Sequence, residues 1–383
     1  MGSFEDIRPY NDLEVAGVVS RLLRDKAFLR FISKWQAPRL HRFAPRLVEM
    51  QVTRRLSKQL SGITSIRSFQ EIVARAAKRL VEESIIEFQY EGIDRLSHDE
   101  AYLFISNHRD IAGDSMLLNY ALYLSGFDTV RIAVGDNLIQ RQFATDLMKL
   151  NKSFFIRRSI EGARNLYKAL MQSSEYIRTS LREGSSVWIA QSEGRAKNGV
   201  DQTDPAVIKM LNLYERKSDF AESIAAMKIV PMSLSYEFDP CDAMKARELT
   251  SMALTGAYEK MDGEDLLNLV TGLAGFKGNV VLRLGEVLEG TFATAEEVAS
   301  EIDRQVMDNI ELFPINYWAL SQIQESDYEK VWNQVRDKAA IGDPKDYEVR
   351  LENCEAGHRQ QWLKMYANPV VNKFHMAALS RCQ

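Results

Sequence analysis

The sequence predicts an α/β protein with a mostly parallel central sheet flanked by helices, an N-terminal helical arm and a helical C-terminal extension. From about Tyr102 onward, short apolar segments typical of buried strands alternate with longer segments of helical spacing. Such βα alternation is characteristic of a parallel sheet covered by helices. Residues 11–88 have helical spacing, without strand-like alternation until the segment IIEFQYEG. Helical patterns dominate again toward the C-terminus.

These patterns divide the chain into three regions. We expect the helical arm in residues 1–84, the α/β domain in residues 85–290 and the helical extension in residues 291–383. The chain has 383 residues, 45% of them hydrophobic, which is enough for a sizeable core. No apolar segment approaches the roughly 20 residues that span a bilayer, and the N-terminus has no apolar signal region. We therefore expect a soluble or peripheral protein.

The individual strands and helices follow from short sequence segments. The predicted strands are AYLFIS, TVRIAVG, SFFIRR, SVWIAQS, KIVPMSLSYE and NVVLRLGEVL. The helical segments between them include SMLLNYALYLSG, EGARNLYKALMQSSEYIRTSLREG and PAVIKMLNLYERKSD. Asp204, just before the last of these segments, and Pro205, its first residue, are residue types preferred at an N-cap and at the first helical position. The three cysteines, Cys241, Cys354 and Cys382, are far apart and form neither metal-ligand spacing nor a disulfide framework.

Charge is distributed unevenly. Residues 21–60 contain eleven Lys and Arg against two acidic residues, a local charge of +9, whereas the whole chain carries −4. The remainder therefore carries −13. The same basic segment contains large apolar side chains, among them Phe28, Phe31, Trp35 and Phe43. This combination suits a helix that lies on an anionic membrane surface, but an amphipathic helix packed on the protein has the same periodicity.

Polar residues gather at or beside the ends of four predicted strands. Ligands of open α/β sheets bind beyond the carboxyl ends of the strands, so these clusters can converge. The four clusters are Asn107-His108-Arg109-Asp110 with Asp114 beyond, Arg157-Arg158, Ser192 to Gly199 in SEGRAKNG, and Val230 to Glu237 in VPMSLSYE.

The residue types in these clusters indicate a particular chemistry. Histidine titrates near neutrality, and a carboxylate on its second nitrogen would fix its tautomer, so His108 is a candidate general base. Neither a G-x-S-x-G elbow nor a cysteine beside a histidine is present, so we expect no protein nucleophile. The arginines can bind a phosphate through two bonds, and Gly194 and Gly199 would allow close backbone approach. The substrate would be a hydroxyl acceptor that carries a phosphate.

Taken in order, NHRDIAGD, FFIRR, SEGRAKNG and VPMSLSYE resemble the four blocks of the glycerolipid acyltransferase superfamily. This superfamily includes glycerol-3-phosphate and 1-acylglycerol-3-phosphate acyltransferases, and the resemblance covers roughly residues 85–290. It implies a base and an orienting aspartate in the first block, and acyl-CoA or acyl-carrier protein as the donor. It further implies that Arg157, Arg158, Glu193, Gly194, Arg195 and Lys197 form the acceptor's phosphate site. Pro231, in the fourth block, would help to shape the acyl-binding side.

Two blocks depart from the family pattern. Five residues separate His108 from Asp114, where the family has four between histidine and aspartate. Either Asp114 orients the histidine or Asp110 does; we favour Asp114, because Asp110 would have to fold back on its own turn. The third block reads EGRAKNG where Glu-Gly-x-Arg-Ser is common. Either Arg195 or Lys197 would then meet the phosphate.

The resemblance implies O-acyl transfer from a thioester to a lysophosphatidate-type acceptor, with glycerol 3-phosphate or another lyso-lipid as the alternative. We expect no cofactor, no metal and no nucleic-acid partner. A cytoplasmic location at the inner face of a membrane, through the basic arm, fits this activity. A non-catalytic membrane-binding protein is the alternative from another class. Lys277 could face the anionic substrate, but we expect it to be a solvated loop residue. Pro231 could instead mark an edge strand or bulge.

Overall fold

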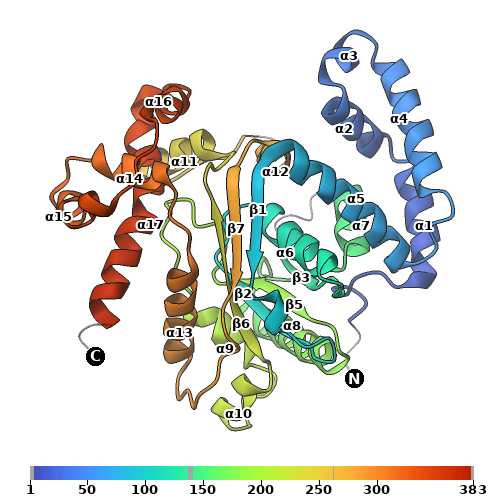
Figure 1. Cartoon of the computed structure of the whole chain (residues 1–383). Coiled ribbons are helices and arrows are strands. Elements are labelled where there is room, and N and C mark those ends of the chain that lie inside the picture. The colour runs from blue at the N-terminus through green and yellow to red at the C-terminus, as the bar shows by residue number, and fades with distance from the viewer. Residues whose placement is uncertain (1–3, 137–140, 262, 381–383) are drawn as a thin grey trace.

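A computed structural model describes residues 4–136, 141–261 and 263–380, and a seven-stranded sheet forms its centre (Figure 1). The strand order is β1-β7-β6-β2-β5-β3-β4. Strands β6, β2, β5, β3 and β4 are parallel, whereas β7 is antiparallel to β6 and pairs in parallel with β1. The predicted mostly parallel sheet is confirmed. The strands are β1 (Ile85–Glu91), β2 (Leu103–Ser106), β3 (Arg131–Gly135), β4 (Ser153–Ile156), β5 (Val187–Ala190), β6 (Ile229–Tyr236) and β7 (Gly278–Leu284).

Helices precede, cover and follow this sheet. The helices before β1 are α1 (Asp12–Leu22), α2 (Lys26–Gln36), α3 (Pro38–Phe43), α4 (Pro45–Leu60) and α5 (Ile66–Ser84). Between β2 and β7 lie α6 (Gly113–Leu124), α7 (Gln142–Leu150), α8 (Ala163–Arg182), α9 (Pro205–Leu211), α10 (Phe220–Ala225), α11 (Asp242–Thr255) and α12 (Glu264–Ala274). After β7 come α13 (Ala295–Asn309), α14 (Pro314–Ser321), α15 (Ser326–Val335), α16 (Pro344–Glu352), the 3-10 turn η4 (Ala356–His358) and α17 (Arg359–Ser380).

The central strand β2 shows how the sheet is buried on both faces. Successive side chains of a strand point to opposite faces. Leu103 and Ile105 join one apolar cluster with residues of α8, α9 and α13, whereas Phe104 joins another with residues of α6. All three are at most 1% exposed. This two-sided burial explains why the central strands read as continuous apolar segments rather than alternating ones.

The N-terminal helices are packed at one end and exposed at the other. Residues of α1, α2 and α5 share an apolar cluster with α7, in which the ring centroids of Phe28 and Phe143 are 5.9 Å apart. Helices α2, α3 and α4 extend away from the sheet (Figure 1). The basic segment of residues 21–60 therefore contains one part that packs on the rest of the protein and one part that projects from it.

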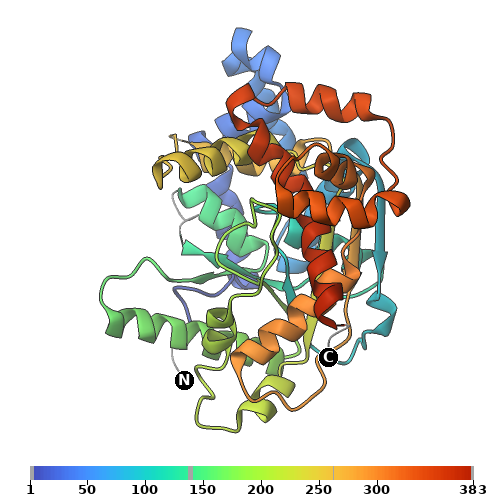
Figure 2. The same cartoon turned by 90° about the vertical axis from the view of Figure 1, so that its left-hand side faces the viewer.

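The C-terminal helices divide between two cores. Helix α13 contributes Val298 and Ile302 to the core of the sheet. Helices α14 to α17 instead form a separate apolar cluster, which includes the fully buried Trp362 and also Ala246 of α11. Figures 1 and 2 show this group of helices beside the sheet.

Two further features concern the helices and the cysteines. Among the helices that the structure describes, none combines the length and apolar character needed to cross a bilayer. Cys241 and Cys354 are buried free thiols, and Cys382 lies outside the described residues.

Candidate active site

The loop after β2 begins with an asparagine that ties it to β6. Asn107 is fully buried, and its side chain donates to the carbonyl of Leu234 at 3.0 Å and accepts from the amide of Leu234 at 2.8 Å. The side chain thus replaces a backbone bond between neighbouring strands at the point where β2 ends. This fixes where the next residue, His108, leaves the sheet.

His108 contacts Asp114 directly. The distance from His108 Nδ1 to Asp114 Oδ2 is 2.7 Å, and the imidazole is 15% exposed. An ionised carboxylate only accepts hydrogen bonds, so Nδ1 carries the proton and Nε2 of the neutral ring is the free basic nitrogen. A buried aspartate and an oriented, partly exposed imidazole form the arrangement that general-base catalysis requires.

Asp114 is held by three further donors. Its Oδ2 also accepts from the amides of Arg109 at 2.7 Å and Asp110 at 3.0 Å, and its Oδ1 accepts from the hydroxyl of Tyr236 at 2.8 Å. Burial, and then the negative charge of Asp114, raise the pKa of Tyr236 well above its ordinary value, so this hydroxyl stays protonated and donates. The carboxylate at the first turn of α6 is therefore held through both of its oxygens.

Asp110, the alternative orienting residue, makes its hydrogen bonds to the turn before α6 and not to the ring. Its Oδ1 accepts from the amides of Ala112 at 3.1 Å and Gly113 at 2.6 Å. Its carboxyl packs against α12, where a Cβ on Gly272 would lie 1.7 Å from Asp110 Oδ2. Burial, and then the charge of Asp114, raise the pKa of Asp110. The additional residue between histidine and aspartate thus belongs to a turn that Asp110 stabilises.

The third block lies against His108 through the backbone. The amide of Ala196 donates to the carbonyl of His108 at 2.8 Å. Gly194 and Gly199 have φ values of +78° and +77°, which favour glycine. Arg195 Nη1 is buried without a hydrogen-bond partner among the described residues, and so are both amide atoms of Gln191, directly after β5. Arg195 Nη1 and Gln191 Nε2 are donors, and buried donors without partners in the described part of the chain suit an anionic ligand.

The other predicted phosphate ligands have partners. Lys197 pairs with Glu248. Arg158 Nη1 lies 3.2 Å from Glu193 Oε2, which joins the second block to the third, and the Glu193 side chain is 76% exposed. Arg157 instead pairs with Asp6 at 2.9 Å. The two arginines thus have different partners.

The surroundings of two residues near the site, Pro231 and Lys277, differ from those that the sequence suggested. Pro231 does not mark an edge or interrupt its strand: it lies within β6, an interior strand, opposite Ile105 of β2. It has no N–H, but its carbonyl accepts from the amide of Gly285 at 2.7 Å. Lys277 is not solvated: it is 1% exposed and donates to the carbonyls of Leu273 and Gly275 at 3.0 and 2.9 Å. Burial lowers its pKa to about 8.

Sequence reasoning missed three residues that support the site. Asp201 Oδ2 lies 2.5 Å from Arg109 Nη2 and also accepts from Asn107. Lys245 Nζ donates to the carbonyl of Arg109 at 2.6 Å. Tyr236, described above, is the third. Tyr236 and Arg109 lay inside the quoted motifs, whereas nothing in the sequence connected Asp201 or Lys245 to them.

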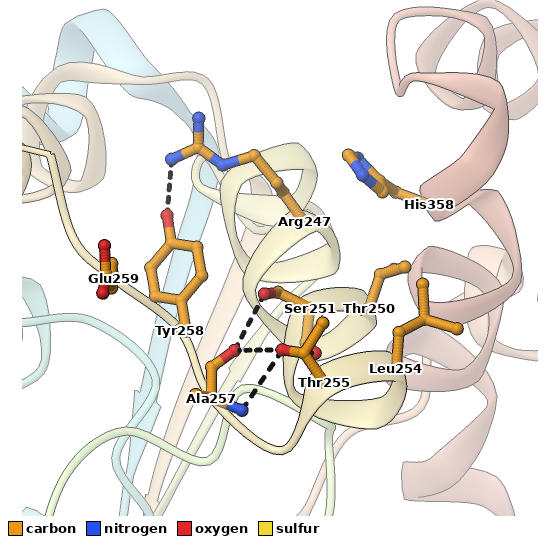
Figure 3. Close-up of a pocket in the computed structure, with 9 residues that line it drawn as sticks. All are labelled: Arg247, Thr250, Ser251, Leu254, Thr255, Ala257, Tyr258, Glu259 and His358. Atoms are coloured by element: carbon orange, nitrogen blue, oxygen red, sulfur yellow. Dashed lines mark hydrogen bonds between the residues drawn. The ribbon is translucent and has the colours of Figure 1, made fainter.

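A separate hollow lies on α11 and the segment that follows it. It has a volume of about 580 Å³, and its lining includes Arg247, Tyr258 and His358 (Figure 3). The predicted site residues are not among those that line it. Arg247 Nη2 donates to the hydroxyl of Tyr258 at 2.6 Å and to Glu264 at 3.1 Å, so this cation is already paired.

Comparison with known proteins gives the following relatives. Residues 87–235 match the family model described as Acyltransferase. Dihydroxyacetone phosphate acyltransferase of Mus musculus is 25% identical over 178 residues, 46% of this chain and 25% of that protein. The Homo sapiens protein is 27% identical over 150 residues, 38% of this chain and 21% of that protein. The matches thus span about a quarter of these relatives' length.

A solved structure also aligns with the chain. It is the 1-acyl-sn-glycerophosphate (LPA) acyltransferase PlsC from Thermotoga maritima, which is 13% identical. The alignment covers 77% of this chain and 92% of that chain, with a TM-score of 0.37.

Proposed function

Because the chain carries a domain of the glycerolipid acyltransferase superfamily, we propose that it moves a fatty acyl group from a thioester donor to the hydroxyl of a 1-acylglycerol 3-phosphate. The observation that carries this proposal is the 2.7 Å contact between His108 and Asp114, on a loop bonded to the one that contains Arg195. A base and a cation for phosphate are the two groups that this reaction needs from the protein.

The proposed reaction is direct acyl transfer. His108 Nε2 takes the proton of the acceptor hydroxyl as the oxygen attacks the thioester carbonyl. The tetrahedral intermediate then expels the thiolate, which receives the proton from His108, and an ester replaces the thioester. Asp114 holds the ring and stabilises its charged form. Proton transfer of this kind contributes roughly a hundred- to ten-thousand-fold.

The phosphate of the acceptor would bind at Arg195 and Arg158. Arg195 has a buried Nη1 without a partner in the described part of the chain, whereas Lys197 is paired with Glu248, so we choose Arg195 between the two. Arg158 pairs with a mostly exposed Glu193, which a phosphate can displace at little cost. Arg157 pairs with Asp6, so we assign it a smaller contribution to phosphate binding. Gly194 would allow close backbone approach, and Pro231 would lie on the acyl side.

The lipid acceptor would be reached through the arm tip, defined as residues 34–50. Phe43, Leu40 and Leu47 are 84%, 66% and 59% exposed. Basic side chains in the same segment are also exposed, namely Lys34, Arg39, Arg42 and Arg46. Apolar side chains among cations suit insertion into an anionic membrane surface. We therefore propose peripheral binding at the cytoplasmic face of a membrane.

Dihydroxyacetone phosphate is the second candidate acceptor, because the matched relatives carry it in their names. Glycerol 3-phosphate is a third acceptor of the same chemistry. All three present a hydroxyl and a phosphate on a three-carbon unit. They differ in whether an acyl chain is already attached, so a membrane is needed only for the first.

A matrix of assays tests the proposal. Purified protein is incubated with each of the three acceptors, and with acyl-CoA or acyl-carrier protein as donor. We expect ester formation with 1-acylglycerol 3-phosphate. Transfer only to dihydroxyacetone phosphate would select the second candidate. Ester formation with none of the combinations, together with retained vesicle binding, would identify a non-catalytic membrane-binding protein.

A further inference from the structure

Helix α17 contacts the loop of residues 195–200, which contains the proposed phosphate ligand. Asn368 Nδ2 donates to the carbonyl of Asn198 at 2.7 Å. The hydroxyl of Tyr328, on α15, donates to Asn368 Oδ1 at 2.7 Å and thereby fixes which way the amide points. Figures 1 and 2 show α17 as the long C-terminal helix beside α13 and α14.

A proline in α17 makes a second contact with the same loop possible. Pro369 has no N–H, so the carbonyl of Met365, four residues earlier, lacks its helical partner. Gly199 packs at this carbonyl: a Cβ on Gly199 would lie 2.2 Å from Met365 O and 3.2 Å from Pro369 Cδ. Gly199 also has a φ of +77°. Both the space and the backbone conformation therefore require glycine.

Backbone hydrogen bonds connect the loop of residues 195–200 to His108, the proposed base. The amide of Gly199 donates to the carbonyl of Ala196 at 3.3 Å, and the amide of Ala196 donates to the carbonyl of His108 at 2.8 Å. Two hydrogen bonds thus connect the residue that α17 contacts to the residue that would accept the substrate proton.

A buried ionic network connects α17 to the other side of the His108 loop. The hydroxyl of Tyr366 donates to Asp242 at 2.9 Å and accepts from the amide of Asp239 at 2.9 Å. Asp239 pairs with Lys245, whose Nζ donates to the carbonyl of Arg109 at 2.6 Å. Burial raises the pKa of Asp239, but the charge of Lys245, hydrogen bonds from Lys245 and from the amide of Cys241, and the charge of Arg195 together hold it below its ordinary value. Asp239 is therefore ionised at neutral pH.

We propose that α17 positions both halves of the active site, the phosphate loop through Asn368 and Gly199 and the His108 loop through Tyr366. This inference rests on the proposed function and deepens it, because it assigns the C-terminal helices to acceptor binding. Asn368 and Gly199 are assigned as positioning residues, since their contacts join α17 to the loop that contains Arg195.

Kinetics of Asn368→Leu test the proposal. The change removes the donor to Asn198 without adding charge near a phosphate. We expect KM for the phosphorylated acceptor to rise about tenfold, while KM for the acyl donor and the melting temperature stay nearly constant. Gln360→Ala, on the same helix, is the matched control, because the Gln360 side-chain amide donates to the exposed Glu325 at 3.0 Å, on the surface. Equal changes in both KM values would overturn the inference.

Hydrogen exchange separates this inference from the proposed function. The amides of Ala196 and Gly199 are measured in the wild type, in Asn368→Leu and in Gly199→Ala, with no substrate present. We expect at least about tenfold faster exchange in both variants and no change in Gln360→Ala. Unchanged exchange in folded variants would overturn the positioning role even if the wild type transfers acyl groups. Faster exchange in a chain without transferase activity would uphold the positioning role and reject only the proposed function.

Discussion

The surroundings of His108 and the arm tip differ in how their side chains are partnered. Asp114 is fully buried and accepts four hydrogen bonds, so its position is determined entirely by the protein. Phe43 at the arm tip is 84% exposed, and Leu40 is 66% exposed. One region satisfies its polar groups internally, whereas the other leaves apolar groups in solvent.

This contrast indicates where each region finds its partner. Buried polar groups are retained when they are fully hydrogen-bonded, and they then fix geometry. Exposed apolar side chains grouped together mark a surface that binds something outside the protein. The His108 loop therefore has the properties of a preorganised reaction site, and the arm tip has those of a docking surface.

The largest effect is expected from His108→Ala. This change removes the proposed base, so kcat should fall by roughly a hundred- to ten-thousand-fold. The ring is partly exposed and its hydrogen bond is to Asp114, which keeps three other donors, so folding should be retained. Initial rates and circular dichroism measure the two effects. Wild-type turnover in the folded variant would contradict the assignment of the base.

Asp114→Asn should have the next largest effect. An amide group cannot accept from all the donors that surround Asp114, so the ring loses its orientation and buried N–H groups are left unpaired. We expect roughly a hundredfold loss of kcat, with a lower melting temperature. Asp110→Asn is the matched control, because the amide oxygen can still accept from Ala112 and Gly113. A larger loss in Asp110→Asn would reverse the roles of the two aspartates.

Changes at the arm tip should affect binding rather than chemistry. Replacing Leu40, Phe43 and Leu47 together with serine removes exposed apolar area, and binding to anionic vesicles should weaken by at least about tenfold. Turnover of a water-soluble acceptor should be unchanged. Leu13→Ser is the control, since Leu13 is 95% exposed on α1, outside the arm tip. Sedimentation with vesicles measures binding, and equal loss in the control would refute the docking surface.

The smallest effect on activity is expected from Asp303→Asn, which alters stability. Burial raises the pKa of Asp303 from 3.8 to about 6. Between these values the folded state holds a proton that the unfolded state has lost, so this residue's contribution to stability falls as pH rises from about 4 to 6. The variant should therefore be more stable than the wild type at pH 7, by about 3 kcal/mol, and equal to it below about pH 4.

Urea unfolding at several pH values measures this difference. Asp303 accepts from the amide of Thr203 at 2.7 Å, and the amide oxygen introduced by Asp303→Asn can accept the same bond, so the fold should be preserved. A stability difference that does not depend on pH would show that titration of Asp303 is not its cause.

Much of the fold could be predicted from local patterns. The six apolar segments predicted as strands correspond to β2 to β7, and the strand-like segment IIEFQYEG corresponds to β1. Buried parallel strands are continuous apolar runs, and polar residues follow where they end. Local patterns also predicted that the first and third blocks can lie close together, because both follow parallel strands at the same edge of the sheet. These properties depend on residues that are near one another in the chain.

Partners distant in the chain could not be predicted in this way. Tyr236 meets Asp114 across 122 positions, and Lys245 meets the carbonyl of Arg109 across 136. The same limit applies to Lys277, which is buried against the end of α12 and donates to its carbonyls. A lysine in a glycine-containing loop is usually solvated, and only tertiary packing reversed that expectation.

The sequence by itself determined the α/β class, the order of the strands along the chain, and the presence of a histidine with two nearby aspartates after β2. Tertiary structure decided which aspartate contacts the ring, which arginine has a buried donor without a hydrogen-bond partner among the described residues, and which helix contacts the loop of residues 195–200. The physical reason is that secondary structure follows from periodic burial, which neighbouring residues encode. The geometry of the site depends instead on hydrogen bonds and close contacts between segments that only folding brings together.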